Sequence, residues 1–510
     1  MIGSNTTEAH PVIGMRIKQA VRNGATLVVA DPRRIWLTKI AKRHLRLRPG
    51  TDVWLLNAML HTIFAEGLAD EEFVARKTED VEALRETVAR YTPEEAELVT
   101  GVRAENIRAT AREYAAEPKA TIFYTLGITE HAVGVDNVWS LANLVLATGH
   151  LGRPNSGLMA LRGQNNVQGG ADAGANPAYL PGYHAVDVAE NRERFSRAWG
   201  VEVPEEPGLR IDEIVGGMGD PVRAVYLVGE DPAKTDPNAH HVEEGLAKLD
   251  FLVVQDIFLH ESAARHADVV LPAASFAEKD GCFTNTERRV SRVRAAVAPP
   301  GDARPDWQIT LGLARALGAD WEYGSPEDVW NEFADLAPMW SGIRYDRLEA
   351  NGIQWPCPDR GHPGTVFLHE DGPARGRGLF HAVEWAPPVE EPDARYPFLL
   401  STGRTLYHYN GGSMTRREPG IVAKQPGPFV ELNTADAVAL GIADGAPVRV
   451  ESRRGELVAA ASVGDRVLPG NVWMAFHWAE AAANWLTTDA VDPRTGTPEY
   501  KACAVRVEPA

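Results

Sequence analysis

Apolar residues along this chain follow helical and strand-like spacings in alternation. They recur at helical spacing after Pro11 and stop near Gly24, and residues 26–31 (TLVVAD) follow as a short apolar run that ends in a polar residue. The pattern continues with further segments of both kinds: helices over 54–65 and 105–116 and a strand over 120–127. Helices that alternate with buried parallel strands predict a doubly wound α/β domain, which we bound at residues 1–164.

A second series of short apolar strands follows. It comprises residues 224–232, 251–256 and 268–274, each with polar residues at or near its carboxyl end, and helical stretches separate the first two. The series predicts a second α/β domain over residues 165–352. Because open α/β sheets bind ligands outside the carboxyl ends of their strands, these ends are the first place to expect a binding site.

The last part of the chain has a different character. Prolines and glycines accumulate over 353–397, which predicts a linker that wraps the surface. Residues 447–463 alternate as a β-hairpin does, and further strands are expected over 470–478 and 502–509. Residues 398–510 are therefore predicted to form a β-rich domain, in shape a small barrel.

Composition and charge are those of a large globular protein. Apolar residues make up 44% of the chain, charged residues 24%, and the net charge is −18. The excess of acidic residues disfavours a surface for nucleic acid or anionic membrane, so we expect no nucleic-acid partner. No apolar run approaches the roughly 20 residues that a membrane span needs, so no span is expected.

The cysteines and the N-terminus bear on the compartment. Cys282, Cys357 and Cys503 lie far apart and form no CxxC motif, which disfavours a disulfide framework or a locally built metal or iron–sulfur site. A reducing, cytoplasmic location fits best. The first residues lack the pattern of a signal peptide. Met1 and Ile2 resemble the end of a strand, so we expect that an upstream segment is absent; a targeting signal would lie there.

Polar residues follow several of the predicted strands. Gly3, Ser4 and Asn5 form a turn whose backbone N–H groups suit a phosphate, although no GxGxxG fingerprint is present. Asp31 and Arg33 follow the first strand, and Asp52 ends a similar stretch. In the second domain, residues 229–236 and 253–256 likewise place polar residues at the ends of predicted strands. Each stretch alone is more typical of a capped loop than of a ligand site, but together they indicate two similar nucleotide sites.

The stretch LRGQNNVQGGADAG, residues 161–174, combines one arginine with many amides and glycines and a single carboxylate. The planar fork of Arg162 matches a carboxylate, and glycines allow the backbone to approach a bulky group. The alternative is an arginine salt-bridged inside a domain junction. Residues 401–415 combine arginine, threonine, histidine and glycine, and His408 there is more typical of a packed or capping histidine than of a catalyst.

Ten segments together resemble the molybdopterin oxidoreductases, and within them the catalytic alpha subunit of molybdenum- or tungsten-dependent formate dehydrogenase. They run through the chain from Ile2 to the C-terminus: IGSNTTEAHP, ADPRR, LRPGTD, GHLGRPNSG, RGQNNVQG, GEDP, VVQDIF, ADVVLPAASFAEKDGCFTNTERR, STGR with HYNGGSMTRR, and TPEYKACAVRV. RGQNNVQG is the segment that favours formate dehydrogenase over relatives that act on nitrate or sulfoxides.

The resemblance implies a bis-(molybdopterin guanine dinucleotide) cofactor with molybdenum or tungsten, one guanine nucleotide lying on each α/β domain. The residues implied around one nucleotide are Asn5, Glu8, Asp31, Arg33, Gly50, Asp52 and Glu130. Those implied around the other are Gly229, Asp231, Thr235, Gln255, Asp256 and Asp306. In the C-terminal domain the implied cofactor contacts are Arg404, Thr405, His408, Asn484, Tyr500 and Lys501.

The resemblance also implies a reaction. Arg162 matches the arginine that anchors the carboxylate of formate, with Gly163 and Gln164 against the pterin, and the reaction is oxidation of formate to carbon dioxide or its reverse. An electron-transfer subunit, or an iron–sulfur or flavin partner, would accept the electrons. The cofactor would carry out the electron transfer, and the protein would orient the cofactor and tune its reactivity.

The chain departs from the family in two respects. Members carry a four-cysteine [4Fe–4S] domain and then a cysteine or selenocysteine followed by histidine that ligates the metal, and neither matches this sequence. We therefore expect a truncated or split catalytic subunit with no metal ligand of its own, whose isolated chain does not reduce dyes with formate. The alternatives are a molybdopterin oxidoreductase for another small substrate such as nitrate, and a non-catalytic cofactor-binding protein.

Overall fold

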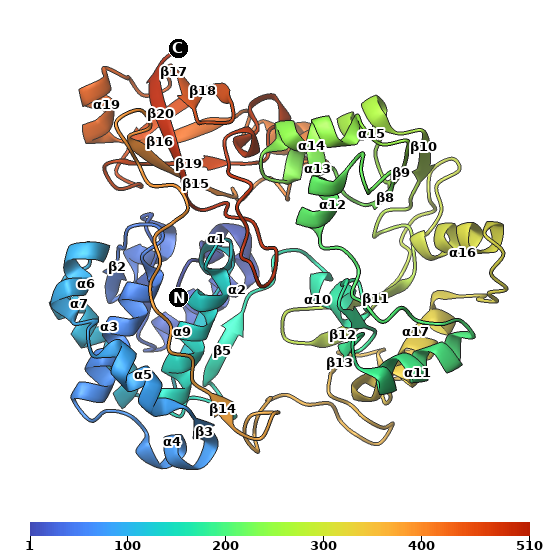
Figure 1. The fold of residues 1–510 in the computed structure, drawn as a ribbon, viewed down its shortest axis with the longest axis horizontal. Helices are drawn as coiled ribbons and strands as arrows, with labels where there is room; N and C mark the ends of the chain where they lie inside the picture. The colour runs from blue at the N-terminus through green and yellow to red at the C-terminus, as the bar shows by residue number, and fades with distance from the viewer. The chain divides into compact units, whose positions relative to one another are not determined.

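The computed structural model describes residues 1–510, which divide into two units (Figure 1). The first unit comprises Met1–Leu161, Ala233–Val242 and Phe367–Ala510, and the second comprises Arg162–Pro232 and Glu243–Val366. The architecture is mixed α/β with a closed barrel in the C-terminal region, as the sequence predicted. No helix combines the length and the apolar character needed to cross a membrane.

The first unit begins with a parallel sheet. Its four strands are β1 (Val28–Ala30), β2 (Arg43–Leu45), β4 (Thr121–Tyr124) and β5 (Gly157–Ala160). β1 pairs with β2 and β4 pairs with β5, while Ile2 forms parallel bridges to Ala30 and to Tyr124 and so joins the two pairs. Asp31 follows β1 directly, so it lies at the carboxyl edge of this sheet.

Helices surround this sheet and carry most of its core. They are α1 (Thr6–Ala9), α2 (Pro11–Arg22), α3 (Asp52–Ala65), α4 (Glu71–Lys77), α5 (Val81–Val88), α6 (Pro93–Thr100), α7 (Ala104–Ala116), α8 (Leu126–Thr129) and α9 (Gly134–Ala147). α3 is apolar on nearly every side and buries Leu55, Leu60 and Ile63, as expected of a helix inside a core. The helices predicted after Pro11 and over 54–65 and 105–116 are confirmed.

The C-terminal region forms a closed six-stranded barrel in the order β15–β19–β16–β18–β17–β20. The strands are β15 (Phe398–Gly403), β16 (Phe429–Asn433), β17 (Pro447–Glu451), β18 (Glu456–Gly464), β19 (Asn471–Ala475) and β20 (Cys503–Pro509), with helices α18 (Pro419–Val422) and α19 (Thr434–Leu440) between them. Buried and exposed residues alternate along β18, so one face fills the barrel. The predicted hairpin is the antiparallel pair β17–β18.

Residues 367–397 form a strap on the first unit. Within it β14 (Gly378–Leu379) pairs in parallel with β3 (Thr78–Glu79). The Asn57 side chain donates to the Val383 carbonyl at 2.9 Å, and the Trp385 indole donates to the Gly50 carbonyl at 2.8 Å. The proline and glycine content predicted a surface course for this segment, whereas these contacts tie it to buried residues of the α/β part.

The second unit contains a parallel sheet in the order β10–β9–β8, formed by β8 (Ala224–Val228), β9 (Phe251–Asp256) and β10 (Val269–Pro272). Its other strands are β6 (Tyr179–Leu180), β7 (His184–Ala185) and the antiparallel set β11 (Gly281–Thr284), β12 (Arg289–Val293) and β13 (Ile353–Gln354). Its helices are α10 (Val167–Asp172), α11 (Ala189–Trp199), α12 (Ile211–Gly217), α15 (Glu261–His266), α16 (Asp306–Ala316) and α17 (Pro326–Leu336). Two more helices, α13 (Pro232–Thr235) and α14 (Ala239–Leu246), occur where the chain passes between the units.

Candidate functional site

Two buried carboxyl groups lie at the carboxyl edge of the first sheet. Asp31 follows β1 and Asp52 begins α3, and both are less than a tenth exposed. Burial raises the pKa of each to about 6, and the charge of Asp52 raises the pKa of Asp31 further. The Asp31 carboxylate accepts a hydrogen bond from the Arg33 amide at 2.9 Å. Both groups were predicted from their position after a strand-like stretch, and both suit a ligand that offers N–H donors.

Arg33 occupies a buried ion-pair cluster. Its guanidinium donates two hydrogen bonds to Glu431 of the barrel, at 2.9 and 2.8 Å, and lies 3.6 Å from the ring centroid of Trp473. Arg466 also pairs with Glu431, at 2.9 Å, and with Glu8, at 3.3 Å. The fork of Arg33 is thus already bound through two of its nitrogens, and a contact with phosphate would rest on the third.

Two further buried pairs join the turn after α8 to the approach to β20. Lys501 pairs with Glu130 at 2.5 Å and donates to the Thr402 carbonyl at 3.1 Å. His131 lies 3.2 Å from Glu499, and both side chains are almost fully buried. Burial is the largest single influence and opposes protonation of His131, but the hydrogen bond to Glu499 and the charges of Asp52 and Glu499 together outweigh it, so the pKa of His131 is raised.

The loop after β15 holds Arg404, Thr405 and His408. The Thr405 amide donates to His477 Nε2 at 2.9 Å, and burial lowers the pKa of His477 to about 4. His408 contacts the Thr415 hydroxyl at 3.1 Å and the Gln425 carbonyl at 2.9 Å, so its ring is held from both sides.

Arg404 in the same loop is a half-buried cation with no carboxylate within ion-pair distance, and its guanidinium lies 5.3 Å from the Phe476 ring centroid. Burial lowers the pKa of Arg404, while the charge of Glu130 opposes that effect. A partly buried guanidinium without a close anion is a suitable place for a phosphate or other anionic group.

Two predicted side chains, Asn484 and Tyr500, converge on the backbone of a third predicted residue, Thr235. The Asn484 amide donates to the Thr235 carbonyl at 2.7 Å and to the Lys234 carbonyl at 3.2 Å, and the Tyr500 hydroxyl donates to the same Thr235 carbonyl at 3.0 Å. All of them belong to the first unit. Thr235 was predicted at the nucleotide of the second α/β domain, whereas these bonds attach it to residues that precede β20.

Several predicted residues also carry buried polar atoms that have no hydrogen-bond partner in the protein. In the first unit these are Asn5 Nδ2, Thr405 Oγ1 and Asn484 Oδ1, and in the second unit Gln164 Nε2. An unpartnered buried polar atom costs about 1–3 kcal/mol, so a group of them at predicted contacts fits a polar ligand.

In the second unit, predicted residues meet at the carboxyl ends of β8 and β9. The Gly229 amide donates to the Gln255 carbonyl at 2.8 Å, and Gly229 has φ = +67°. The Gln255 side chain donates to Asp306 at 2.8 Å, and Asp306 also pairs with Lys279. Gly229, Gln255 and Asp306 were predicted contacts, whereas Lys279, which pairs with Asp306, was not indicated by the sequence.

Asp231 and Asp256 lie on either side of His260 in the same unit. His260 Nδ1 is 3.4 Å from Asp231, and its Nε2 is 3.7 Å from Asp256. The Ser262 hydroxyl donates to Asp231 as well. Burial raises the pKa of Asp256, partly offset by hydrogen bonds from the amides of residues 257 and 258.

The segment from Arg162 to Gln164 opens the second unit. The Arg162 amide donates to the Thr286 hydroxyl at 3.1 Å, and the arginine, Gly163 and Gln164 are all partly exposed. Gly50 in the first unit has φ = +77° and faces the Pro388 ring, where a Cβ would come within 2.4 Å. A side chain at Gly50 would therefore clash with the strap.

The sequence missed several of these residues. Glu431 lies inside a barrel strand, where a charged residue in an apolar run is a usable signal. His131 and His477 gave no local signal, because their partners are 368 and 72 residues away in the chain. Asp172, the one carboxylate of residues 161–174, accepts hydrogen bonds from three side chains, which the local sequence does not indicate.

Comparisons with known protein families match the chain to two models. Residues 1–316 match "Molybdopterin oxidoreductase", and residues 398–504 match "Molydopterin dinucleotide binding domain". The second match coincides with the closed barrel.

Whole-chain relatives agree with these matches. The F420-dependent formate dehydrogenase subunit alpha of Methanocaldococcus jannaschii is 45% identical over 512 residues, covering 100% of this chain and 76% of that protein. Formate dehydrogenase H of Escherichia coli is 41% identical over 519 residues, 100% of this chain and 72% of that protein. The assimilatory nitrate reductase catalytic subunit of Bacillus subtilis is 35% identical over 528 residues, 100% and 74%.

A solved structure shares the fold. Acetylene hydratase from Pelobacter acetylenicus superposes with a TM-score of 0.78 at 19% identity, over 100% of this chain and 77% of that one. At that identity the likeness concerns the fold alone.

Proposed function

This chain belongs to the molybdopterin oxidoreductase family, and from that membership we propose that it oxidises formate to carbon dioxide or catalyses the reverse reaction. It is a formate dehydrogenase-like enzyme by its relatives, two of which carry that name at 45% and 41% identity. The observation that carries the proposal of formate is the whole-chain similarity together with Arg162 in the RGQNNVQG segment.

The cofactor proposed is bis-(molybdopterin guanine dinucleotide) with molybdenum or tungsten. The side chains of this chain fit such a group, because Asn5, Thr405 and Asn484 each hold a buried polar atom without a protein partner and Arg404 holds a cation without a close anion. The barrel's match to a molybdopterin dinucleotide-binding domain points the same way. When bound, the cofactor would accept the two electrons that formate gives up.

The residues that we propose for the two nucleotides divide between the strand ends. Asp31 and Asp52 would accept hydrogen bonds from one guanine, since both carboxyl groups are buried and need donors. The remaining contacts proposed for that nucleotide and for the barrel are Asn5, Glu8, Arg33, Gly50, Glu130, Arg404, Thr405, His408, Asn484, Tyr500 and Lys501. Those proposed for the second nucleotide are Gly229, Asp231, Thr235, Gln255, Asp256 and Asp306.

Arg162 would hold the substrate. Its guanidinium can bind both oxygens of a carboxylate, which fixes the C–H bond of formate in one direction. Gln164 brings a buried amide without a protein partner, and Gly163 leaves room beside it, so both suit contact with the pterin. In this scheme the protein binds and orients formate, while the cofactor takes the electrons.

The proposal extends to the domains of the chain, its electron-accepting partner and its location. We propose that one nucleotide binds to the α/β domain of residues 1–164 and the other to the α/β domain of residues 165–352. The linker of residues 353–397 leads to the barrel domain of residues 398–510, which would contact the cofactor as well. An electron-transfer subunit or an iron–sulfur or flavin protein would take the electrons, and a [4Fe–4S] cluster would belong to a part outside this chain. The reaction would take place in the cytoplasm.

The test is Arg162→Ala in the cofactor-loaded enzyme, with the metal and pterin content of each preparation measured. We expect the rate of formate oxidation at low substrate to fall by about a hundredfold or more with cofactor content unchanged, because the carboxylate loses its only proposed anchor. Arg197→Ala, an exposed arginine on α11, is the matched control and should leave the rate unchanged. Unaltered formate turnover in Arg162→Ala would contradict the proposal.

Nitrate is the second candidate substrate, because a nitrate reductase is 35% identical over the whole chain. The two are separated by supplying the same loaded enzyme with formate and an oxidised dye, or with nitrate and a reduced dye. Turnover confined to the nitrate assay would replace the formate proposal. A loaded protein that turns over neither would favour a cofactor-binding role without catalysis.

A further inference from the structure

Two hydrogen bonds join the turn that carries Arg162 to the β11–β12 hairpin of the same unit. The Arg162 amide donates to the Thr286 hydroxyl at 3.1 Å, and the Asn166 side chain accepts from the Thr284 amide at 2.9 Å. Thr284 is the last residue of β11, and Thr286 lies in the turn that leads to β12. The backbone of residues 162–166 is therefore held at both of its ends by one hairpin.

The turn of this hairpin is held by side-chain bonds of its own. Within it the Asn285 side chain accepts from the amides of Glu287 and Arg289, at 3.0 Å each. The neighbouring strand β13 adds two more bonds. Its Gln354 side chain donates to the Glu287 carbonyl at 2.9 Å and accepts from the Arg289 guanidinium at 3.1 Å. A turn fixed from within and from an adjacent strand is a rigid support for the residues that it contacts.

Asn166 fits tightly against the hairpin. It precedes α10 with φ = +62°, a conformation that asparagine tolerates better than most residues. At Gly169, in the first turn of α10, a Cβ would come within 2.1 Å of the Asn166 side-chain oxygen and 3.2 Å of the Thr284 hydroxyl. The absence of a side chain at this position lets α10 lie beside β11 (Figure 1). The second asparagine and the last glycine of RGQNNVQG thus both serve the contact with the hairpin.

We propose that Thr286 and Asn166 are positioning residues: through them the hairpin fixes the backbone from which Arg162 projects, and so sets where its guanidinium meets a carboxylate. This inference rests on the proposed binding of formate by Arg162. The planar fork binds both oxygens only when it is aligned with them, so a shift of the backbone at residue 162 misaligns the pair. A misplacement of about 1 Å can cost about a hundredfold in rate, even when the residue that causes it touches no substrate.

The test makes two measurements on cofactor-loaded enzyme of equal metal and pterin content: kcat and KM for formate, and the dissociation constant of nitrite by calorimetry. Nitrite is a bent anion with two oxygens, like formate, and has no C–H bond to oxidise. Thr286→Val removes the hydroxyl that accepts from the Arg162 amide and keeps the branched shape. We expect kcat/KM to fall and the nitrite dissociation constant to rise, each by about threefold to tenfold, the effect of one neutral hydrogen bond. Thr286→Ser keeps the hydroxyl and should stay within about twofold of the unaltered enzyme.

Ser196→Ala is the matched control, because the Ser196 hydroxyl accepts from the Val203 amide at 3.0 Å in the same unit. It removes a bond of the same kind, so it should lower the thermal midpoint about as much as Thr286→Val does but leave nitrite binding unchanged. An equal loss of nitrite binding in Ser196→Ala would mean a general loosening of the unit and overturn the inference.

Asn166→Gly tests the other end of the turn. Glycine accepts a positive φ, so the variant removes only the bond to the Thr284 amide, and nitrite should again bind about threefold to tenfold more weakly. This variant also carries the test if Thr286→Val does not fold. Unchanged nitrite binding in the folded variants overturns the inference, and so does failure of both to fold, since the two residues are then needed for structure alone.

A double variant asks whether Thr286 acts through Arg162. In the Arg162→Ala background, Thr286→Val should lower the residual kcat/KM no further, because a positioning residue has no effect once the group that it positions is gone. A second fall of the same size would mean that Thr286 acts independently of Arg162, which contradicts the inference.

Failure of the inference and failure of the proposed function give different results. If the unaltered loaded enzyme neither turns over formate nor binds nitrite in an Arg162-dependent manner, the proposed function is wrong and the role of Thr286 and Asn166 falls with it. If Arg162→Ala abolishes nitrite binding while Thr286→Val and Asn166→Gly leave it unchanged, the proposed function stands and only the positioning role is wrong.

Discussion

At the scale of single residues, Asp31 and Asp52 carry buried carboxyl groups that stay protonated up to about pH 6. In an unfolded chain an aspartate titrates near about 3.9. A folded-state pKa above the unfolded value means that folding takes up protons, so the protonated form supports the fold below about pH 4 and this support is lost as the pH rises through about 6. Near neutral pH the two ionised carboxylates therefore oppose folding, and the proposed guanine would relieve that cost by supplying N–H donors.

Asp52→Asn tests this linkage in the cofactor-free chain. We expect its free energy of unfolding in urea to rise by about 1–2 kcal/mol at pH 7.5 and to change little at pH 4.5, since asparagine has no charge to bury. Asp320→Asn, at an exposed position, is the control and should change neither value. A loss of stability at pH 7.5 would show that the Asp52 carboxylate is favourably placed without a ligand.

His477 shows the opposite linkage. Its Nε2 accepts from the Thr405 amide while its Nδ1 contacts the Asn410 carbonyl, an arrangement that only the neutral ring with a proton on Nδ1 can satisfy. Burial lowers the pKa of His477 to about 4, below the unfolded value of about 6.5. The unfolded chain thus binds more protons between these values, and the stability present above about pH 6.5 is lost as the pH falls towards 4.

His477→Gln removes this titration. In thermal melts from pH 7.5 to 4.5, the unaltered chain should lose up to about 3 kcal/mol through His477, while the variant lacks that loss and starts from a lower stability. The gap between the two curves should therefore narrow as the pH falls. Parallel curves over the whole range would mean that His477 titrates alike in the folded and unfolded chain. The carboxyl groups of Asp31 and Asp52 are common to both proteins and cancel in the comparison.

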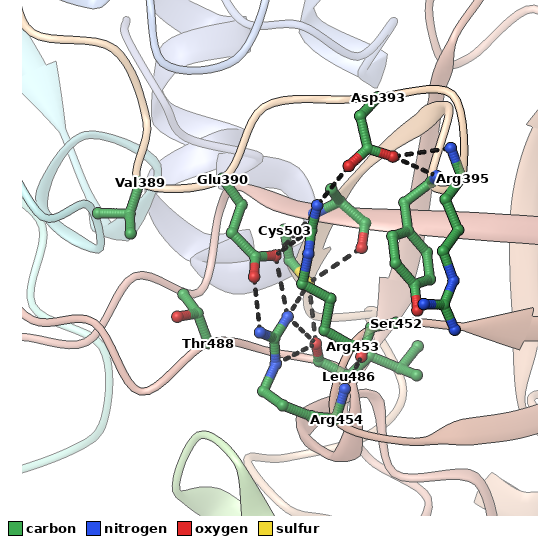
Figure 2. A network of polar contacts seen from close by, with 12 residues as sticks. Val389, Glu390, Asp393, Arg395, Ser452, Arg453, Arg454, Leu486, Thr488 and Cys503 are labelled. Carbon is green, nitrogen blue, oxygen red and sulfur yellow. Dashed lines mark hydrogen bonds and ion pairs between the residues drawn. The ribbon is translucent and has the colours of Figure 1, made fainter.

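At the scale of elements, ion pairs fasten the strap of residues 367–397 to the barrel, and Arg454, whose side chain is 14% exposed, makes the most enclosed of them (Figure 2). Arg454 donates to both oxygens of Glu390, at 2.7 and 2.9 Å, and to the Leu486 carbonyl, and its guanidinium lies 3.1 Å from Cys503 Sγ. Glu390 in turn accepts from the Ala504 amide at 3.1 Å. Every polar atom of the pair is therefore used, which is the condition under which a buried ion pair holds its place.

Arg454→Lys should loosen the strap, because a lysine cannot bind two carboxylate oxygens and a carbonyl at once. We expect the free energy of unfolding to fall by about 2–4 kcal/mol and cleavage by a protease within residues 386–397 to become faster. Arg453→Lys is the matched control. Arg453 neighbours Arg454 in sequence, pairs with Asp393 and, at 3.5 Å, with one oxygen of Glu390, and is 39% exposed, so a smaller loss of stability is expected. Equal effects of the two substitutions would contradict a special role for Arg454.

The elements that the sequence predicted are those whose signal is local. α3 and α7 are predicted by helical spacing of apolar residues, and β17 and β18 are predicted by alternation around a turn. Both patterns are local, because each can be recognised within about a dozen consecutive residues. Asp31 and Asp52 could be proposed from the sequence, because polar residues after strand-like stretches mark candidate ligand sites. Glu431 and Glu390 could not, because their partners Arg33 and Arg454 are 398 and 64 residues away, and a pairing at such separation leaves no periodicity to detect.

At the scale of the whole molecule, the chain passes four times between its two units, after Leu161, Pro232, Val242 and Val366. Each unit has its own apolar core. In the first unit one core is built around α3 and another fills the barrel, and in the second a core centres on Trp340. Units with separate cores can unfold separately, so two-state behaviour is not expected of the cofactor-free chain.

Calorimetry of the cofactor-free and cofactor-loaded chains tests this view together with the proposed division of the nucleotides. We expect two transitions without cofactor. A ligand at a hundred times its dissociation constant adds about 2.7 kcal/mol to the free energy of unfolding of the unit that it binds. A cofactor bound by residues of both units should therefore raise the midpoint temperatures of both transitions and bring them together. Asp231→Ala, in the second unit, should reduce the rise of that unit's transition alone. If loading raises one transition and leaves the other in place, the cofactor is held by one unit only, and the assignment of a nucleotide to the other has to be given up.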